Sequence, residues 1–339
     1  MRIVRGDASD RATTKACFEV VRAAGEADDP FGPPWSLRRL RGWMEHPTDP
    51  SELWIAADET TGGCHGCYWL VLPERENRDR AHLWINVRPS SRRRGFGTAL
   101  LRHAAERATA AGRSVLASES YLGTAGAAFA ARVGATAGLV EARRVLVLGK
   151  IPAGRIASLR ERAAGAAAGY SLVSWDGRTP DEYLARYAEV ENAMADAPHD
   201  EGSEPLRWDA ARVREQIDDI RERNGSHIYT LAALHDASGE MAAVTAVEAD
   251  RDNPEWGHQL LTAVVRKHRG HRLGLLVKTA MLDWLAAAEP QLDRIVTGNA
   301  AVNRWMIAIN EELGYELLEP LAQSYELPVA DARREAGPA

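Results

Sequence analysis

Two short basic segments that contain glycine lie about 177 residues apart in the sequence. The first runs from Arg92 to Thr98 (RRRGFGT) and the second from Arg269 to Gly274 (RGHRLG). Each follows strand-forming residues and leads into a run with helical periodicity. A helix that begins in this way exposes several unpartnered backbone N–H groups and the positive end of its dipole. Because glycine lets an anion approach the backbone closely, each segment predicts a binding site for a pyrophosphate group.

The composition of both loops supports an anion as the ligand, since arginine adds charge-assisted hydrogen bonds to backbone donors. Other phosphate-binding loops do not fit: the sequence lacks the P-loop pattern, and it lacks the G-x-G-x-x-G fingerprint of dinucleotide-binding folds. In the first loop the residues expected at the anion are Arg92, Arg93, Arg94, Gly95, Phe96, Gly97 and Thr98. In the second loop they are Arg269, Gly270, His271, Arg272, Leu273 and Gly274.

The surroundings of the two loops repeat as well. Each loop is preceded by strand candidates: Arg2–Arg5, Leu53–Ala57, Cys67–Leu72 and Ala81–Val87 in the first half, and Tyr170–Trp175, Ile228–Leu234, Met241–Val247 and Trp256–Val265 in the second. The helices expected after the loops are Ala99–Ala111 and Leu275–Ala288. Two copies of one α/β unit explain this pattern best. We expect domains at 1–150 and 169–330, a linker at 151–168 that includes a short helix, and a flexible tail at 331–339.

Length and composition limit the class of protein. A chain of 339 residues is long enough for about two domains. Its formal net charge of −6 argues against a general nucleic-acid binder. No run of 18 or more apolar residues occurs and no signal peptide is recognisable, so we expect a cytoplasmic protein without membrane contact. The pair Cys64 and Cys67 lacks a second pair of ligands, and no metal is expected.

The first loop resembles a known signature. Arg92-x-x-Gly95-x-Gly97 is similar to Q/R-x-x-G-x-G/A, the acyl-CoA pyrophosphate loop of the GNAT superfamily of N-acyltransferases. The second loop is a variant, with Arg272 in place of the first signature glycine and Gly270 two residues earlier. The resemblance covers nearly the whole chain as two repeats, in a layout similar to that of mycothiol synthase-like proteins.

This resemblance implies a fold and an activity. The fold would be α/β, with two tandem domains that each have a mixed, mostly antiparallel central sheet flanked by helices. The activity would be transfer of an acetyl group from acetyl-CoA to a primary amine of a small molecule, by direct attack in a ternary complex. The co-substrate would be acetyl-CoA, and the protein would be a monomer or a homodimer.

Further site residues follow from the resemblance. The strand before the loop supplies backbone N–H groups to the tetrahedral oxyanion in this family, which here implies Val87 and Arg88, or Val264 and Val265. The segment from Thr297 to Tyr315 is similar to the part of the family that separates two strands and runs a helix beside the pantetheine arm. Asn303 and Asn310 share one face of that helix and are expected to contact the arm. Asn303 is an equally good helix N-cap.

The acid–base candidates lie in the C-terminal half. Some relatives carry a glutamate base about eleven residues before the first signature residue, and this spacing leads to His258 in the second half and to Ala81, next to His82, in the first. Glu248, on the preceding strand, is the second candidate. The tyrosine acid of many relatives is replaced by Asn310 and by Ala130, so the proton donor is unassigned.

Three interpretations of function follow. In the first, the C-terminal half is catalytic and the N-terminal half binds CoA weakly or serves as a scaffold, although the N-terminal loop matches the signature better. In the second, both halves have lost catalysis and the protein is a CoA-binding or partner-binding pseudoenzyme. In the third, the acceptor is a lysine of a protein rather than a small molecule.

Overall fold

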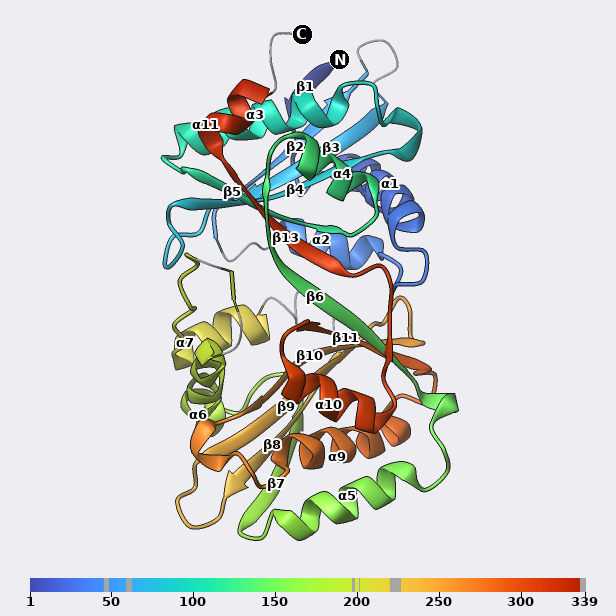
Figure 1. Cartoon of the computed structure of the whole chain (residues 1–339), viewed down its shortest axis with the longest axis vertical. Helices are drawn as coiled ribbons and strands as arrows, with labels where there is room; N and C mark the ends of the chain where they lie inside the picture. Colours follow the sequence, from blue (N-terminus) through green and yellow to red (C-terminus); the bar gives the residue numbers. More distant parts are fainter. Residues whose placement is uncertain (46–48, 59–62, 197–198, 201, 220–226, 336–339) are drawn as a thin grey trace. The chain divides into compact units, whose positions relative to one another are not determined.

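The computed structural model describes residues 1–45, 49–58, 63–196, 199–200, 202–219 and 227–335 (Figure 1). Contacts divide the chain into two compact units. Unit 1 comprises residues 1–141, 199–204 and 319–339, and unit 2 comprises residues 142–198 and 205–318. Among the described residues, no helix is both long enough and apolar enough to cross a bilayer.

Unit 1 has a mixed sheet in the order β1-β2-β3-β4-β5-β13-β6. Its strands are β1 (Arg2–Arg5), β2 (Ser51–Ala57), β3 (Cys64–Val71), β4 (Arg80–Val87), β5 (Val115–Tyr121), β13 (Ala322–Pro328) and the first part of β6 (Thr136–Val147). Its helices are α1 (Arg11–Asp28), α2 (Leu37–Glu45), α3 (Phe96–Ala110), α4 (Ala125–Arg132), α11 (Val329–Glu335) and the short 3-10 helix η1 (Pro89–Ser91). Neighbouring strands pair antiparallel except β4 with β5, which are parallel.

The alternation of residues along β3 explains how the helices cover this sheet. Tyr68 and Leu70 point to one face, where they join the buried cluster that contains α3. Cys67 and Trp69 point to the other face, where they pack with α1 and α2. Asp10 fixes the start of α1 by accepting hydrogen bonds from the backbone N–H groups of Ala12 and Thr13. The sheet of unit 1 is therefore buried on both faces.

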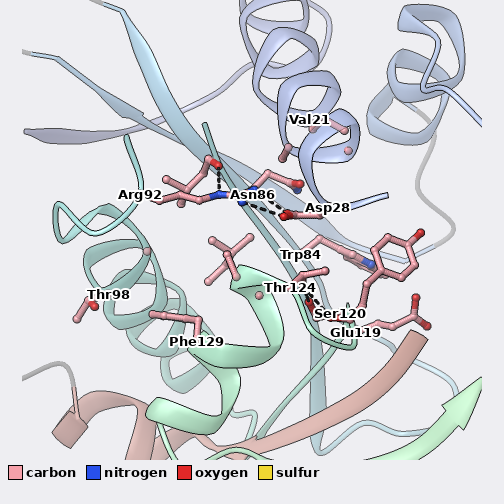
Figure 2. Close-up of a pocket in the computed structure, with 18 of the residues that line it drawn as sticks. Val21, Asp28, Trp84, Asn86, Arg92, Thr98, Glu119, Ser120, Thr124 and Phe129 are labelled. Carbon is pink, nitrogen blue, oxygen red and sulfur yellow. Dashed lines mark hydrogen bonds and ion pairs between the residues drawn. The ribbon is translucent and has the colours of Figure 1, made fainter. Parts of the chain in front are cut away.

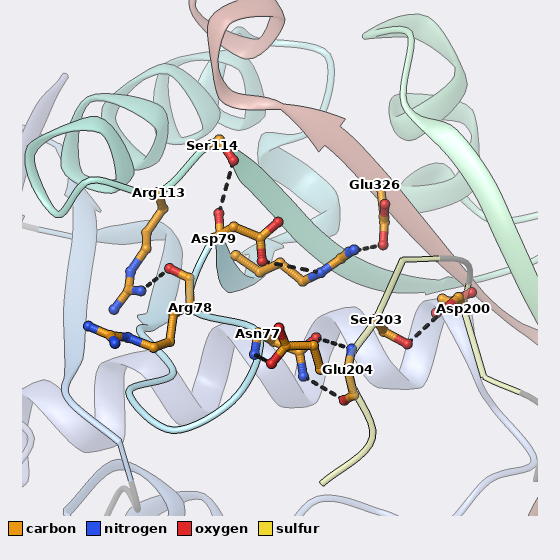
Figure 3. Close-up of polar contacts among 10 residues, drawn as sticks. Asn77, Arg78, Asp79, Arg113, Ser114, Asp200, Ser203, Glu204 and Glu326 are labelled. Atoms are coloured by element: carbon orange, nitrogen blue, oxygen red, sulfur yellow. Dashed lines mark hydrogen bonds and ion pairs between the residues drawn. The ribbon is translucent and has the colours of Figure 1, made fainter. Parts of the chain in front are cut away.

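The last strand of the chain belongs to unit 1. β13 lies between β5 and β6 and pairs antiparallel with both, as the red strand in Figure 1 shows. The segment 199–204 also joins this unit: Asp200 accepts hydrogen bonds from Leu139 N–H and the Ser324 hydroxyl, at 2.8 and 2.7 Å. Asn77 and Glu204 exchange three further hydrogen bonds (Figure 3). By compactness, the chain thus divides differently from the expected domains at 1–150 and 169–330, because strand pairing brings distant segments together.

Unit 2 has the sheet order β6-β11-β10-β9-β8-β7, with β12 (Glu316–Leu317) also pairing with β6. Its other strands are β7 (Tyr170–Asp176), β8 (His227–His235), β9 (Met241–Ala249), β10 (Trp256–Val264) and β11 (Arg294–Ala300). Its helices are α5 (Arg155–Ala166), α6 (Asp181–Asn192), α7 (Ala210–Arg212), α9 (Leu273–Ala288) and α10 (Arg304–Leu313). Short helical turns also occur at η2 (Leu148–Lys150), η3 (Ala193–Asp196), η4 (Val213–Asp219) and η5 (Arg266–His268). The sheet pairs antiparallel from β7 to β10, and β10 pairs parallel with β11.

Two segments expected to be peripheral are part of the packed structure. The short helix expected within the linker is α5, whose Leu159 and Ala163 are buried in the largest core cluster of unit 2. At the C-terminus, α11 extends into the expected flexible tail, and its Ala332 is fully buried against α3. Residues 336–339 lie outside the described residues. Helical spacing of small apolar residues explains why both segments can pack closely on a neighbouring helix.

Candidate functional site

The pairing between β4 and β5 stops partway along the strands. It ends at His82 and Ala117, whereas β4 continues to Val87 and β5 to Tyr121. Arg88 N–H donates to the carbonyl of His65 on β3, at 2.9 Å. Because alternate residues of an antiparallel strand bond to the same neighbour, Ile85 and Val87 turn their backbone groups to the other side, into the gap. The gap is therefore lined by backbone donors and acceptors.

The glycine loop of unit 1 lies at the open end of this gap. Arg93 and Gly95 both have left-handed backbones, with φ of 62° and 86°, and α3 begins at Phe96. No side chain caps this helix, so the first N–H groups of α3 remain available to a ligand. A substituent at Gly95 would meet no atom within 4 Å, which leaves open space on that side of the loop. This geometry is that of an anion seat at a helix N-terminus.

Arg92, the first signature residue, is held by the protein itself. Its guanidinium donates two hydrogen bonds to the Asp28 carboxylate, at 2.8 and 2.6 Å, and a third to the carbonyl of Val87, at 3.3 Å. This bidentate pair joins the end of α1 to the loop (Figure 2). Arg92 therefore fixes the loop rather than extending toward a ligand. Arg93 and Arg94 are the exposed cations of the loop, and Arg94 lies over the Phe96 ring.

A cavity of about 630 Å³ opens from the loop into unit 1. Its wall is formed by α1, the α1–α2 connection, α2, β3, β4, the loop, β5 and α4. The lining residues are Val21, Ala24, Gly25, Asp28, Trp35, Trp43, Trp69, Trp84, Ile85, Asn86, Val87, Arg92, Arg93, Gly95, Gly97, Thr98, Glu119, Ser120, Tyr121, Thr124, Ala125, Gly126, Phe129 and Arg132. Its size is within the usual range for small-molecule sites.

The two ends of the cavity differ in chemistry. At the loop, Arg132 of α4 donates a hydrogen bond to the Thr98 hydroxyl, at 2.8 Å, and Arg93 lines the same region. Away from the loop, four tryptophans and Glu119 form the wall. Figure 2 shows Thr98 and Arg92 on one side and Trp84 with Glu119 on the other. One end is thus cationic and suited to phosphate, and the other is aromatic with a carboxylate.

The loop of unit 2 follows the same path with its residue types exchanged. Gly270 and Arg272 are left-handed, with φ of 92° and 52°, where unit 1 has Arg93 and Gly95. Arg269 donates to the carbonyl of Val264, at 3.2 Å, just as Arg92 does to that of Val87. Arg272, which stands where the signature has its first glycine, therefore does not change the path of the second loop. An L residue is strained in this region, and each loop has one glycine and one arginine at its two left-handed positions.

The strands of unit 2 separate in the same way. Pairing between β10 and β11 ends at His258 and Val296. His258 lies opposite Glu248 across β10 and β9, and both residues are 9% exposed. A bulge between Gln259 and Leu261 adds one residue to β10. Because of this bulge, the unit 1 counterpart of His258 in the ladder is His82, and not Ala81 as the spacing suggests.

Two of the expected amide donors are already used. Val265 N–H donates to the carbonyl of Ala242, at 2.9 Å, and Arg88 N–H donates to His65 as described above. Either amide could serve an oxyanion only if its hydrogen bond to the neighbouring strand were broken. Val87 and Val264 face the gaps and stay candidates for that role.

The expected pantetheine contacts of unit 2 have other partners. Asn310 is fully buried; its carbonyl accepts a hydrogen bond from Lys278, at 2.8 Å, and its amide donates to Asn299, at 2.8 Å. Asn303 caps α10, accepting from Met306 N–H at 3.3 Å. Lys278 is itself buried above the Tyr315 ring, 4.7 Å from the ring centre, and burial lowers its pKa to about 7. The side chain of Asn310 therefore hydrogen-bonds to groups in the interior instead of facing a ligand.

Several lining residues carried no local signal in the sequence. Glu119, Ser120 and Asn86 lie on strands whose separation depends on long-range pairing. Asp28 lies at the end of α1, and its role depends on Arg92, which is 64 residues away. Arg132 was detectable in principle, as a basic residue in the last turn of the helix after the separated strand.

Comparison with known proteins agrees with this geometry. A family model described as an acetyltransferase (GNAT) domain matches residues 49–134, which include β3, β4, the loop, α3, β5 and α4. No curated protein matched the chain. A solved tandem GNAT protein from the clavulanic acid biosynthesis pathway, determined without acetyl-CoA, is 29% identical with a TM-score of 0.80, over 100% of this chain and 99% of that one.

More distant structures share the fold. A GCN5-related N-acetyltransferase from Sphaerobacter thermophilus is 15% identical with a TM-score of 0.64, over 96% of both chains. A GCN5-related N-acetyltransferase from Kribbella flavida is 14% identical with a TM-score of 0.53, over 96% of this chain and 70% of that one. The expected α/β fold with two tandem domains is confirmed. Residues 49–134 therefore form a GNAT acetyltransferase domain, and over its whole length the chain is similar to a protein with two tandem GNAT domains.

Proposed function

We propose that the chain is an N-acetyltransferase that moves the acetyl group of acetyl-CoA onto a primary amine of a small molecule, and that unit 1 binds acetyl-CoA. The observation that carries the proposal is the cavity of about 630 Å³ between the separated strands β4 and β5, with a glycine loop and a helix N-terminus at its cationic end. The similarity to a tandem GNAT protein supports the choice of donor.

Different residues of unit 1 would bind different parts of acetyl-CoA. The N–H groups at the start of α3, together with Arg93 and Arg132, would hold the pyrophosphate. The backbone groups of Ile85 and Val87 would pair with the amides of the pantetheine arm, as an added strand pairs with a sheet edge. This arrangement brings the thioester to the point where β4 and β5 separate, beside Trp84 and Glu119.

Glu119 is the proposed base of unit 1. An alkyl ammonium must lose a proton before its nitrogen can attack, and a carboxylate on the cavity wall can take that proton directly or through water. The amine nitrogen then bonds to the acyl carbon, the carbon–sulfur bond breaks, and the sulfur takes a proton. Tyr121 lines the same cavity and is the proposed donor of that proton.

Unit 2 keeps a second set of candidates. His258 and Glu248, paired across β10 and β9, are the proposed acid–base residues there if unit 2 is the catalytic unit. We expect the protein to act in the cytoplasm as a monomer or homodimer.

Calorimetric titration with acetyl-CoA tests the donor site. Valine at Gly95, whose φ is 86°, strains the loop and displaces its N–H groups, so Gly95→Val is expected to weaken binding about 100-fold. Gly112→Val is the matched control, since Gly112 has φ of 71°, has open space beside it and does not line the cavity. Equal affinity of both variants and the unchanged protein would contradict the proposal for unit 1. Absence of thiol release with any amine or protein lysine, despite binding, would favour a pseudoenzyme.

A further inference from the structure

The end of the unit 1 cavity away from the loop is built mainly from indole rings. Trp35, Trp43, Trp69 and Trp84 all line it, and they come from the α1–α2 connection, α2, β3 and β4. Trp43 meets Trp35 and Trp84 edge to face, with ring centres 6.2 and 6.0 Å apart, and Trp69 stacks on Trp84 at 5.9 Å. Rings that are steeply inclined to one another form the walls of a corner, and Trp43 lies between the other two. The result is a continuous aromatic wall.

This wall is accessible from the cavity even though most of its rings are packed. Trp69 is 8% exposed and belongs to the core cluster under α1, whereas Trp43 is 43% exposed. A large apolar surface left open in this way marks a binding site more often than a defect of packing. Because Trp43 is only partly covered by the protein, its ring is the part of the wall most available to a ligand.

Charge at this end is limited. Among the described residues that line the cavity, two carry carboxylates, Asp28 and Glu119, and Asp28 is committed to Arg92. The Arg39 guanidinium lies 5.9 Å from the centre of the Trp35 ring. One carboxylate is enough for the ammonium group that reacts. It is not enough for an acceptor with several ammonium groups, and Arg39 adds a positive charge that would repel one.

The wall also disfavours a strongly hydrated acceptor. A sugar or peptide backbone buried against indole faces would lose hydrogen bonds to water without recovering them. An aromatic ring would gain buried apolar area together with edge-to-face or stacked contacts with the tryptophans.

We propose that the acceptor of unit 1 is an amine carried on an aromatic ring through a short aliphatic chain, with the ring against Trp43 and Trp84 and the nitrogen next to Glu119. This inference rests on the proposed acetyl transfer in unit 1 and names its acceptor class. The same contacts account for binding and for reaction: the ring is held by the wall, and the nitrogen lies where the carboxylate can take its proton.

The test uses the full chain loaded with CoA and two probes, 2-phenylethylamine and glucosamine, titrated by calorimetry. We expect 2-phenylethylamine to bind at least tenfold more tightly than glucosamine. Trp43→Ala is expected to weaken binding of 2-phenylethylamine about tenfold, and Trp43→Phe only about threefold, because phenylalanine keeps an aromatic face. Trp305→Ala is the matched control, since Trp305 is 72% exposed in unit 2, and it should change nothing.

Two results would overturn the inference: equal affinity for the two amines, or an unchanged affinity for 2-phenylethylamine in Trp43→Ala that still binds acetyl-CoA normally. A third concerns the acyl donor. If octanoyl-CoA binds at least tenfold more tightly than acetyl-CoA and Trp43→Ala removes the difference, the wall holds an acyl chain and the acceptor assignment is wrong. Failure of acetyl-CoA to bind at all would instead refute the proposed function, so the two failures are distinguishable.

Discussion

The two units build the same backbone from different residues. Both loops have two left-handed positions separated by one residue, but the order of glycine and arginine is reversed: Arg93 and Gly95 in unit 1, Gly270 and Arg272 in unit 2. Both keep the hydrogen bond from an arginine to the carbonyl at the end of the preceding strand. The path of a loop can therefore be retained after its signature residues have changed. The absence of a signature does not show that the loop has a different shape.

The chemistry around the two loops differs more than the loops do. In both units, the helix that follows the separated strand ends with the same backbone hydrogen bond. A glycine N–H, of Gly134 or Gly314, donates to the carbonyl three residues earlier. Two residues before these glycines, unit 1 has Arg132 and unit 2 has Glu312. The Glu312 carboxylate pairs with Arg162 of α5. In unit 1 an arginine contacts Thr98 beside the loop, whereas the corresponding helix position of unit 2 has a glutamate paired with Arg162, which favours unit 1 as the acyl-CoA site.

The point where the strands separate differs as well. His82 and His258 occupy the same ladder position, and two residues farther along the next strand unit 1 has Glu119 where unit 2 has Gly298. If unit 1 is catalytic, the carboxylate is the essential difference. If unit 2 is catalytic, the base must be His258 or Glu248.

The largest effect is therefore expected from removing the carboxylate of unit 1. Glu119→Gln keeps the size of the side chain but cannot take a proton, and we expect kcat to fall about 100-fold or more while the affinity for acetyl-CoA is unchanged. His258→Gln is the matched variant in unit 2 and should leave kcat within about twofold. Thiol release at saturating acetyl-CoA measures both. The reverse pattern would assign catalysis to unit 2.

This comparison also shows what the sequence could reveal. The repeat, both loops, and the strands and helices beside them are local patterns, and they were predicted from the residues: β4 and α9, for example, lie within a few residues of the expected ranges. The spacing matches His258 with Ala81, one residue away from its counterpart His82 in the ladder, and this error has a different origin. A bulge in β10 changes the register, and no local feature of the sequence shows on which side of a bulge a residue will be counted.

Long-range pairing explains the other differences. The pairing of β13 with β5 joins residues about 200 apart in sequence, so the expected domain boundaries could not foresee it. The partner of Asn310 is Lys278, on another helix, and Asn310 alone resembles a ligand-binding residue. The four tryptophans of the cavity come from separate elements, and only the folded sheet brings them together.

A second difference between the units lies inside them. At the sixth residue of the helix after the loop, unit 1 has the apolar Leu101 and unit 2 has Lys278. Ala130 of unit 1 corresponds to Asn310 of unit 2, because near the end of its helix each residue accepts, at its backbone carbonyl, a hydrogen bond from the N–H five residues later. Giving unit 2 the residues of unit 1, by Lys278→Leu with Asn310→Ala, removes a buried cation and its amide partner together. We expect this double variant to raise the free energy of unfolding by roughly 1–4 kcal/mol near neutral pH.

The pH dependence of that gain has a definite sign. Burial lowers the pKa of Lys278 from its ordinary 10.5 to about 7 in the folded state. Between these values the unfolded chain binds more protons, so the contribution of Lys278 to stability rises with pH across this window. The advantage of the double variant should therefore shrink from pH 7 toward pH 10, as measured by urea unfolding. Lys150→Leu removes a lysine that is 66% exposed, and it should change neither the stability nor its pH dependence by more than about 1 kcal/mol. An unchanged pH profile in the double variant would show that Lys278 is not the group responsible.

The smallest expected effect comes from giving unit 1 the charge that unit 2 has at the corresponding position of the helix after the separated strand. Arg132→Glu removes the hydrogen bond to Thr98 and places a carboxylate at the cationic end of the cavity, so we expect acetyl-CoA to bind about tenfold more weakly, about 1.4 kcal/mol. The loss should be greater at low salt, because the repulsion between a surface carboxylate and the phosphates is screened by ions. Arg333→Glu makes the same change of charge on α11, away from the lining residues, and controls for the net charge of the protein. Equal affinities of the two variants at low and high salt would mean that α4 takes no part in holding the phosphates. The difference between the units would then lie in the separated strands alone.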